Sequence, residues 1–240
     1  MPYCLHTSKE KLSYHKLGKG NPIILLHGWG ARGELMLPIS KALPYFTYIA
    51  PDFYGHGLSP HPDYPLTVKD FSESIIELLR YEKIERATFI CHSFGGRVGL
   101  YIASHYPDMV ERLILCDSAG LKPKRGVKYY IKRANFIIRR TFGLSTDKCG
   151  SIEYKALSGA MKKTFSNVVN YYQDDQLKNI SAPTLVVWGD KDRVTPISMA
   201  RKFVKQIDNS KLHIIKGAGH FSYAEDLKDF KRVVEKFLEC

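Results

Sequence analysis

Short apolar runs alternate with stretches of helical periodicity along most of the chain. Continuous apolar runs such as Ile23–Leu26 suit strands that are covered on both faces. Apolar residues at helical spacing, as at Phe71, Ile75 and Leu78, predict an amphipathic helix. The pattern predicts strands at residues 3–7, 12–17, 23–26, 46–50, 87–91, 113–116, 184–188 and 212–215 and helices at 33–43, 68–81, 94–105, 197–207 and 230–238. We therefore expect an α/β fold: an antiparallel start, then a mainly parallel sheet with helices on both faces.

One interval breaks this alternation. Residues 121–176 contain no clear strand, and helix-like patterns cover 129–141, 152–165 and 165–172. We interpret 121–176 as a helical cap inserted between two strands of a core formed by residues 1–120 and 177–240.

Charge is concentrated in the same interval. The chain of 240 residues has a formal net charge of +12, and residues 121–176 carry twelve Lys or Arg against four Asp or Glu. No apolar run approaches the roughly 20 residues that span a bilayer, and the N-terminus lacks the pattern of a secretory signal. Five scattered cysteines without a CxxC pair predict reduced thiols, with no disulfide framework and no zinc site. These features favour a cytoplasmic protein.

A serine ends the apolar run of "FICHSFGG", residues 89–96. Ser93 falls between a predicted strand and a predicted helix, at the edge of a parallel sheet where ligands bind. Small residues two positions before and after it, Cys91 and Gly95, allow a sharp turn that exposes the hydroxyl. This is the pattern of a nucleophile elbow, with cysteine in place of the usual first glycine. The competing interpretation is a serine that caps an ordinary helix.

A serine hydroxyl needs a base, and the base needs an orienting acid. His220 follows the last predicted strand, and Asp192 follows the strand before it, so the chain order is serine, acid, histidine. We favour Asp192 as the acid. Asp190 is interpreted as a turn residue, and Asp117, at the end of an earlier strand, stays a third candidate.

A developing oxyanion requires preorganised backbone donors. The N–H of Phe94, directly after the serine, is one candidate. The loop His27-Gly28-Trp29-Gly30 follows another strand at the same edge, and its glycines allow close approach to a substrate, so the Trp29 N–H is the second.

Five segments together resemble the α/β-hydrolase superfamily in its lid-bearing, esterase-like branch: "LLHGWG", "PDFYGHGLS", "CHSFGG", "VVWGDKDRVTP" and "GAGHFSYAED". The resemblance covers residues 12–120 and 177–240. It implies Ser93 as nucleophile, Asp192 as acid, His220 as base, and Trp29 and Phe94 as oxyanion donors. It gives the "PDFYGHGLS" loop a structural role, so His56 has no catalytic one. Relatives that cleave carbon–halogen bonds or epoxides carry aspartate at the nucleophile position, so serine favours acyl transfer to water.

The sequence thus predicts a serine hydrolase that cleaves carboxylic esters of small molecules, with thioesters as a further substrate class. No cofactor or metal is expected. The alternatives are carbon–carbon bond hydrolysis and a slow or non-catalytic receptor on the same fold. The basic surplus is either a solvated face or a surface for an acidic partner. The cap arrangement resembles that of carboxylesterases acting on acyl groups of acidic carrier proteins, such as the pimeloyl carrier methyl ester esterase. Nucleic-acid binding is not expected, because no known module accompanies the charge.

Overall fold

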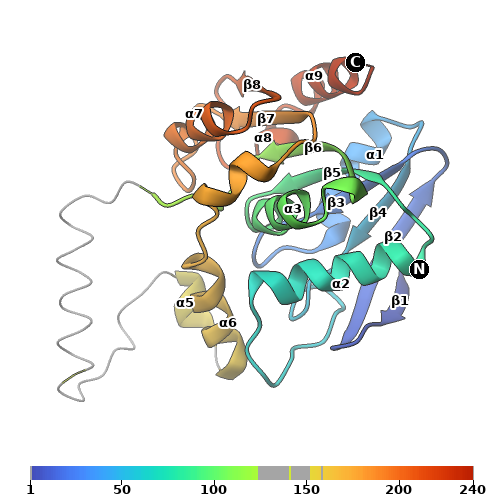
Figure 1. Ribbon diagram of the computed structural model, residues 1–240, viewed down its shortest axis with the longest axis vertical. Coiled ribbons are helices and arrows are strands. Elements are labelled where there is room, and N and C mark those ends of the chain that lie inside the picture. Colours follow the sequence, from blue (N-terminus) through green and yellow to red (C-terminus); the bar gives the residue numbers. More distant parts are fainter. Residues whose placement is uncertain (1, 124–140, 142–151, 158, 240) are drawn as a thin grey trace.

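The computed structural model describes residues 2–123, 141, 152–157 and 159–239. Its centre is an eight-stranded sheet in the order β1-β2-β4-β3-β5-β6-β7-β8 (Figure 1). The strands are β1 (Tyr3–His6), β2 (Lys11–Gly18), β3 (Pro22–Leu26), β4 (Thr47–Pro51), β5 (Ala87–His92), β6 (Val110–Cys116), β7 (Thr184–Gly189) and β8 (Ser210–Ile215). β2 pairs antiparallel with β1 and β4, and every other neighbouring pair is parallel. The predicted fold class is confirmed.

The helices form a layer on each face of the sheet. The α-helices that flank the sheet are α1 (Pro38–Ala42), α2 (Val68–Tyr81), α3 (Phe94–His105), α7 (Ile197–Gln206), α8 (Ser222–Glu225) and α9 (Leu227–Leu238), and the 3₁₀ helices are η1 (Gly33–Met36), η2 (Pro107–Met109) and η3 (Asp174–Asn179). Residues of α2, α3 and α7 share one buried cluster with alternate strand residues. Residues of α1, α8 and α9 share the other cluster with the intervening strand residues. The period of two along each strand thus divides the core into two halves.

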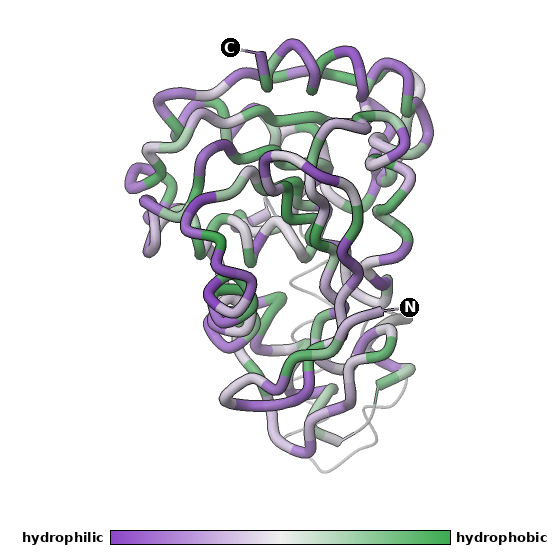
Figure 2. The backbone as a smooth tube through the Cα atoms, turned by 90° about the vertical axis from the view of Figure 1, so that its right-hand side faces the viewer, coloured by the Kyte–Doolittle hydropathy of each residue, from purple (hydrophilic) through white to green (hydrophobic). Residues whose placement is uncertain are grey.

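Helical periodicity locates the longer helices well. α2 and α3 span the predicted residues 68–81 and 94–105. The last helix, α9, carries hydrophilic and hydrophobic residues in every turn (Figure 2) and buries Phe230, Val234 and Phe237 on one face. None of the helices within the described ranges is both long and apolar enough to cross a membrane.

Several predicted boundaries were wrong: α9 begins at Leu227 rather than at residue 230, and α5 (Ile152–Ala156) and α6 (Gly159–Val169) replace the helices predicted at 152–165 and 165–172. Two further errors have a physical cause in the sequence. The helix expected at 33–43 is two short helices, η1 and α1, because Pro38 occupies the first turn of α1 and has no N–H for a longer helix. β6 begins at Val110, three residues before the predicted start. Glu111 and Arg112, which form an ion pair with each other, concealed the beginning of that strand in the sequence pattern.

Helices α5 and α6 lie within the predicted cap interval, apart from the helices that flank the sheet (Figure 1). α6 packs onto the core, where Val168 joins one of the buried clusters, and two of its other contacts are specific. The Thr164 hydroxyl accepts a 2.9 Å hydrogen bond from the Leu66 amide, and the Phe165 ring meets the Trp29 ring edge-on at 5.1 Å. The helix predicted at 129–141 lies outside the described residues, except for Thr141.

Eight of the twelve basic residues of 121–176 also lie outside the described residues. The acidic partner expected from this charge therefore stays a prediction.

Candidate active site

Ser93 connects β5 directly to α3. Its backbone has φ 49° and ψ −110°, a conformation that costs a non-glycine residue about 1–3 kcal/mol. Its side chain makes no capping hydrogen bond to the helix, so the interpretation of Ser93 as an ordinary cap is wrong. Instead, the Ser93 amide donates to the Cys116 carbonyl at 3.1 Å, and the Ser93 carbonyl accepts from the Ala119 amide at 3.0 Å. Neighbouring segments of the sheet edge therefore hold the strained turn in place.

Close packing explains the small residues around the turn. A Cβ on Gly95 would lie 2.2 Å from the Leu26 carbonyl oxygen of β3, which real structures do not allow. The Cys91 side chain, which stands where the usual motif has glycine, is fully buried. A Cβ on Gly99 would lie 2.4 Å from its Sγ. Gly99, six residues after Ser93, thus provides the space that the cysteine needs.

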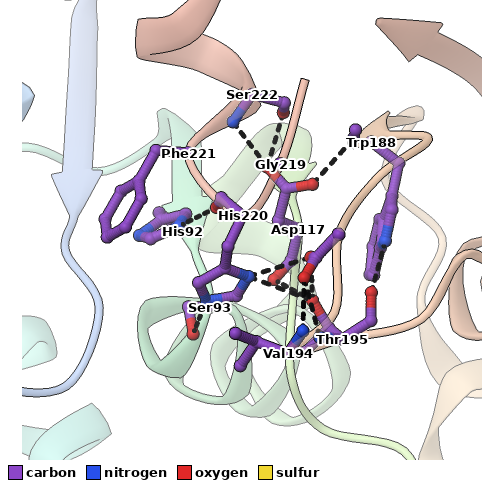
Figure 3. Close-up of polar contacts among 12 residues, drawn as sticks. His92, Ser93, Asp117, Trp188, Val194, Thr195, Gly219, His220, Phe221 and Ser222 are labelled. Atoms are coloured by element: carbon purple, nitrogen blue, oxygen red, sulfur yellow. Dashed lines mark hydrogen bonds and ion pairs between the residues drawn. The ribbon is translucent and has the colours of Figure 1, made fainter. Parts of the chain in front are cut away.

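Ser93, His220 and Asp192 meet at this edge of the sheet. Figure 3 shows the His220 ring beside Ser93. His220 Nε2 lies 3.0 Å from Ser93 Oγ, and His220 Nδ1 lies 2.9 Å from Asp192 Oδ2. A neutral imidazole that donates Nδ1–H to the carboxylate leaves Nε2 free to accept the hydroxyl proton. The geometry therefore forms a continuous hydrogen-bonded chain from carboxylate to hydroxyl.

Asp192 is the best satisfied carboxylate of the site. Oδ1 accepts from the amides of Val194 and Thr195, at 2.7 and 3.0 Å. Oδ2 accepts from the Thr195 hydroxyl at 2.5 Å as well as from His220. Burial raises the pKa of Asp192, but the hydrogen bonds from His220 and Thr195 outweigh it and hold the pKa below its ordinary value. The carboxyl group is consequently ionised at neutral pH.

The two other candidate acids occupy different places. Asp190 is exposed, and its Oδ1 accepts from the Gly217 amide at 2.7 Å, which shapes the loop. Asp117 is fully buried, with φ 45°, and its carboxylate accepts from the Gly189 amide at 2.9 Å and from the Ser222 amide and hydroxyl at 3.0 and 2.5 Å. Burial raises the pKa of Asp117 to about 7, although these hydrogen bonds oppose the shift. These hydrogen bonds of the Asp117 carboxylate join β7 to Ser222, and none of them reaches the His220 ring.

Residues 219–222, which we call the histidine segment, are held by side chains from three separate places. His92 Nε2 lies 2.8 Å from the His220 carbonyl oxygen (Figure 3). Glu225 accepts from the amides of Gly219 and Phe221, at 2.8 and 3.1 Å. Asp117 holds Ser222. Burial lowers the pKa of His92 to about 4, so its ring is neutral and donates Nε2–H to the carbonyl.

The residues named for an oxyanion site lie beside Ser93. Trp29 and Phe94 line the same cavity as Ser93. A Cβ on Gly28 would lie 3.3 Å from the Ser93 Cβ, so the loop approaches the serine closely. Within the described residues, no acceptor bonds to the amide of Trp29 or Phe94. Both amides are therefore available to a ligand.

The cavity in front of Ser93 has a volume of about 710 Å³. Its wall is mostly apolar and combines loops of the core with α6 and the segments flanking it, including Trp29, Leu121, Phe165, Val168, Val194 and Met199. Arg97 is the one Lys, Arg, Asp or Glu among the described residues that line it. In the same described ranges, no group of three or more His, Cys, Asp or Glu could hold a metal ion.

Comparison with known proteins agrees with this architecture. The model of the alpha/beta hydrolase family matches residues 23–233. The chain belongs to the alpha/beta hydrolase family.

Relatives within this family differ in the substrates that their names record. A 2-hydroxymuconate semialdehyde hydrolase of Pseudomonas putida is 28% identical over 95% of this chain and 90% of its own length. A hydrolase of Pseudomonas aeruginosa PA01 has a TM-score of 0.81 and 25% identity, over 100% of this chain and 98% of its own. An esterase of Exiguobacterium antarcticum has a TM-score of 0.82 and 21% identity over the whole of both chains, a likeness of fold. The protein is thus a hydrolase by family, and these likenesses leave the bond that it cleaves undecided.

Sequence reasoning missed several residues of the site. His92 lies inside the quoted "CHSFGG" motif and Glu225 inside "GAGHFSYAED", but neither position indicates a partner in the sequence. Thr195 follows Asp192 by three residues, close enough along the chain for the Asp192 carboxylate to accept a hydrogen bond from the Thr195 amide. Arg97 follows the elbow glycines inside the predicted helix, and no motif in the sequence indicates that it lines the cavity.

Proposed function

We propose that this protein is a serine hydrolase that cleaves carboxylic esters through an acyl-enzyme intermediate. Thioesters are a second substrate class for the same mechanism. The observation that carries the proposal is the chain of hydrogen bonds from Asp192 through His220 to Ser93, at 2.9 and 3.0 Å, beside an apolar cavity. A half-buried hydroxyl on a strained turn, with a base in reach, is an arrangement suited to nucleophilic catalysis.

The proposed cycle has two halves. His220 Nε2 takes the Ser93 proton as Oγ attacks the acyl carbon, and Asp192 stabilises the imidazolium that forms. The amides of Trp29 and Phe94 donate to the oxyanion of the tetrahedral intermediate. His220 then gives the proton to the leaving alcohol or thiol. In the second half, His220 takes a proton from a water molecule that attacks the acyl carbon, and it returns that proton to Ser93 Oγ as the Oγ–acyl bond breaks and the acid leaves.

Carbon–carbon bond hydrolysis is the second candidate, and one comparison favours it. The Pseudomonas putida relative is named for 2-hydroxymuconate semialdehyde, a compound that contains no ester, so its hydrolysis breaks another bond. Both candidate reactions use the same three side chains. The choice between them depends on the substrate rather than on the triad.

The test combines labelling with turnover. A fluorophosphonate should label wild-type protein and not Ser93→Ala, which separates a reactive serine from a passive receptor site. Wild type should then hydrolyse p-nitrophenyl esters from acetate to laurate, with Ser93→Ala and His220→Ala at least about 1,000-fold slower. Labelling without turnover of any ester would contradict the esterase proposal. Turnover of 2-hydroxymuconate semialdehyde alone would favour the second candidate.

A further inference from the structure

Arg97 places a cation in the wall of the cavity in front of Ser93. It lies in the first turns of α3, four residues after Ser93, and is 7% exposed. No Asp or Glu is found among the described residues that line this cavity, and the rest of the wall is largely apolar. A substrate in the cavity therefore meets one fixed charge, and that charge is positive.

The guanidinium has no anionic partner in the described part of the chain. Its Nη1 donates to the Tyr171 carbonyl, and its Nη2 lies 3.5 Å from the Val169 carbonyl oxygen. None of the ion pairs that the described residues form includes Arg97. Burial lowers its pKa to about 10, so the group still carries its charge at neutral pH. A buried charge without a counter-ion is costly, and an anionic ligand would relieve that cost.

The two hydrogen bonds to backbone carbonyls leave donors of the Arg97 guanidinium for a ligand. A guanidinium has five N–H donors in a planar fork that matches a carboxylate, and the contacts above use two of them. They also fix the side chain between α3 and the C-terminal end of α6, so the fork is held in one place before a ligand arrives. Fixed donors bind a ligand with little loss of conformational freedom.

We propose that Arg97 binds a carboxylate carried by the acyl part of the substrate, so that the enzyme selects acyl groups with a second, anionic end. The inference rests on the proposed function, because it assigns the acyl side of the reaction at Ser93. Four residues of helix separate the two Cα atoms by about 6 Å along the axis. Half-esters of medium-length dicarboxylic acids are the matching probes.

The experiment compares two substrates that differ only in charge. One is the p-nitrophenyl half-ester of adipic acid, and the other is the p-nitrophenyl ester of adipamic acid, in which a carboxamide replaces the carboxylate. Wild type should prefer the carboxylate by about tenfold or more in kcat/KM, the effect of one charge-assisted hydrogen bond. Arg97→Met should bring the ratio close to one, and Arg97→Lys should keep part of it. Arg201→Gln, which removes an exposed charge on α7, should keep the wild-type ratio.

A second measurement avoids the variants. Adipate should protect wild-type Ser93 against fluorophosphonate labelling at a concentration about tenfold lower than adipamide does. Equal protection, an equal rate with both esters, or an equal loss for both in Arg97→Met would overturn the inference. None of these outcomes affects hydrolysis of the neutral ester by wild type, so the proposed function stands if that ester is hydrolysed. If wild type hydrolysed neither of these two esters and no ester of the p-nitrophenyl panel, the result would instead count against the proposed function.

Discussion

Ser93 and His220 face each other across 3.0 Å, yet the chain holds them by different means. The elbow around Ser93 is held by backbone hydrogen bonds and by close packing of Gly95 against the Leu26 carbonyl and Gly99 against the Cys91 thiol, and it involves no titratable group that changes charge near neutral pH. The histidine segment is held by polar side chains, namely His92, Asp117 and Glu225. Packing of this kind is insensitive to pH, whereas a hydrogen bond to a carboxyl group changes with its protonation. The two halves of the site should therefore fail under different perturbations.

The largest effect is expected at Asp117, because its charge is buried beneath the histidine segment. Its pKa in the folded protein is about 7, above the ordinary value of 3.8, so the folded state binds the proton more tightly. The free energy of unfolding then falls as pH rises from about 4 to 7, by up to about 4 kcal/mol from this group. Asp117→Asn, which does not titrate there, should lose this component, so its deficit relative to wild type should shrink across that range. Urea unfolding at several pH values measures it.

Two buried histidines act in the opposite direction over part of the same range. Burial lowers the pKa of His27 to about 3 and that of His92 to about 4, so both give stability that grows as pH rises toward 6.5. Their effect cancels in the difference between wild type and Asp117→Asn. Ser222→Ala is the matched control. The Ser222 hydroxyl lowers the pKa of Asp117, so its loss should move the decline to higher pH. A pH-independent difference between wild type and Asp117→Asn would refute this account.

The sequence predicted the elbow better than the histidine segment, because the elbow depends on residues that are neighbours along the chain. The elbow is a local feature, because Ser93, Gly95 and the strand before them are adjacent along the chain, and the turn limits which residues fit. The fold could also be predicted, since strand runs and helical periodicity are local patterns, and errors arose where Pro38 and the Glu111–Arg112 pair interrupted them.

The partners of the histidine segment could not be predicted, because they come from distant parts of the chain. His92 is 128 residues from His220, and Asp117 is 105 residues from Ser222. The register of β5, β6 and β7 brings these residues to one edge, and the sequence alone does not state that register. Asp117 was considered as an acid for His220. Its carboxylate instead bonds to Gly189 and Ser222, partners that lie 72 and 105 residues further along the chain.

On the packing side, an intermediate effect is expected from Gly99→Ala. The new Cβ would lie 2.4 Å from Cys91 Sγ and 3.4 Å from a Leu113 methyl carbon, so α3 would have to move away from the sheet. Overpacking of this kind costs about 1–3 kcal/mol in the free energy of unfolding. Because the sulfur is the close contact, Cys91→Ala should rescue it.

The double variant Cys91→Ala/Gly99→Ala should therefore be more stable than the sum of the two single changes predicts. We expect a coupling energy of about 1 kcal/mol or more from urea denaturation of the four proteins. The loss in Gly99→Ala should be the same at pH 5 and pH 8, in contrast to the Asp117 effect. Additive single changes would show that Gly99 does not make room for Cys91.

The smallest effect is expected at His92, where the two halves of the site meet, since this residue precedes Ser93 and bonds to His220. His92→Leu removes the donor to the His220 carbonyl and leaves that oxygen without its 2.8 Å partner. One hydrogen bond contributes about 1 kcal/mol, so kcat for p-nitrophenyl acetate should fall by about five- to tenfold, with a smaller change in KM. His92→Gln can place a neutral N–H near the same carbonyl and should recover most of the loss. If leucine were as active as histidine at this position, the elbow packing alone would suffice to align the serine and the imidazole.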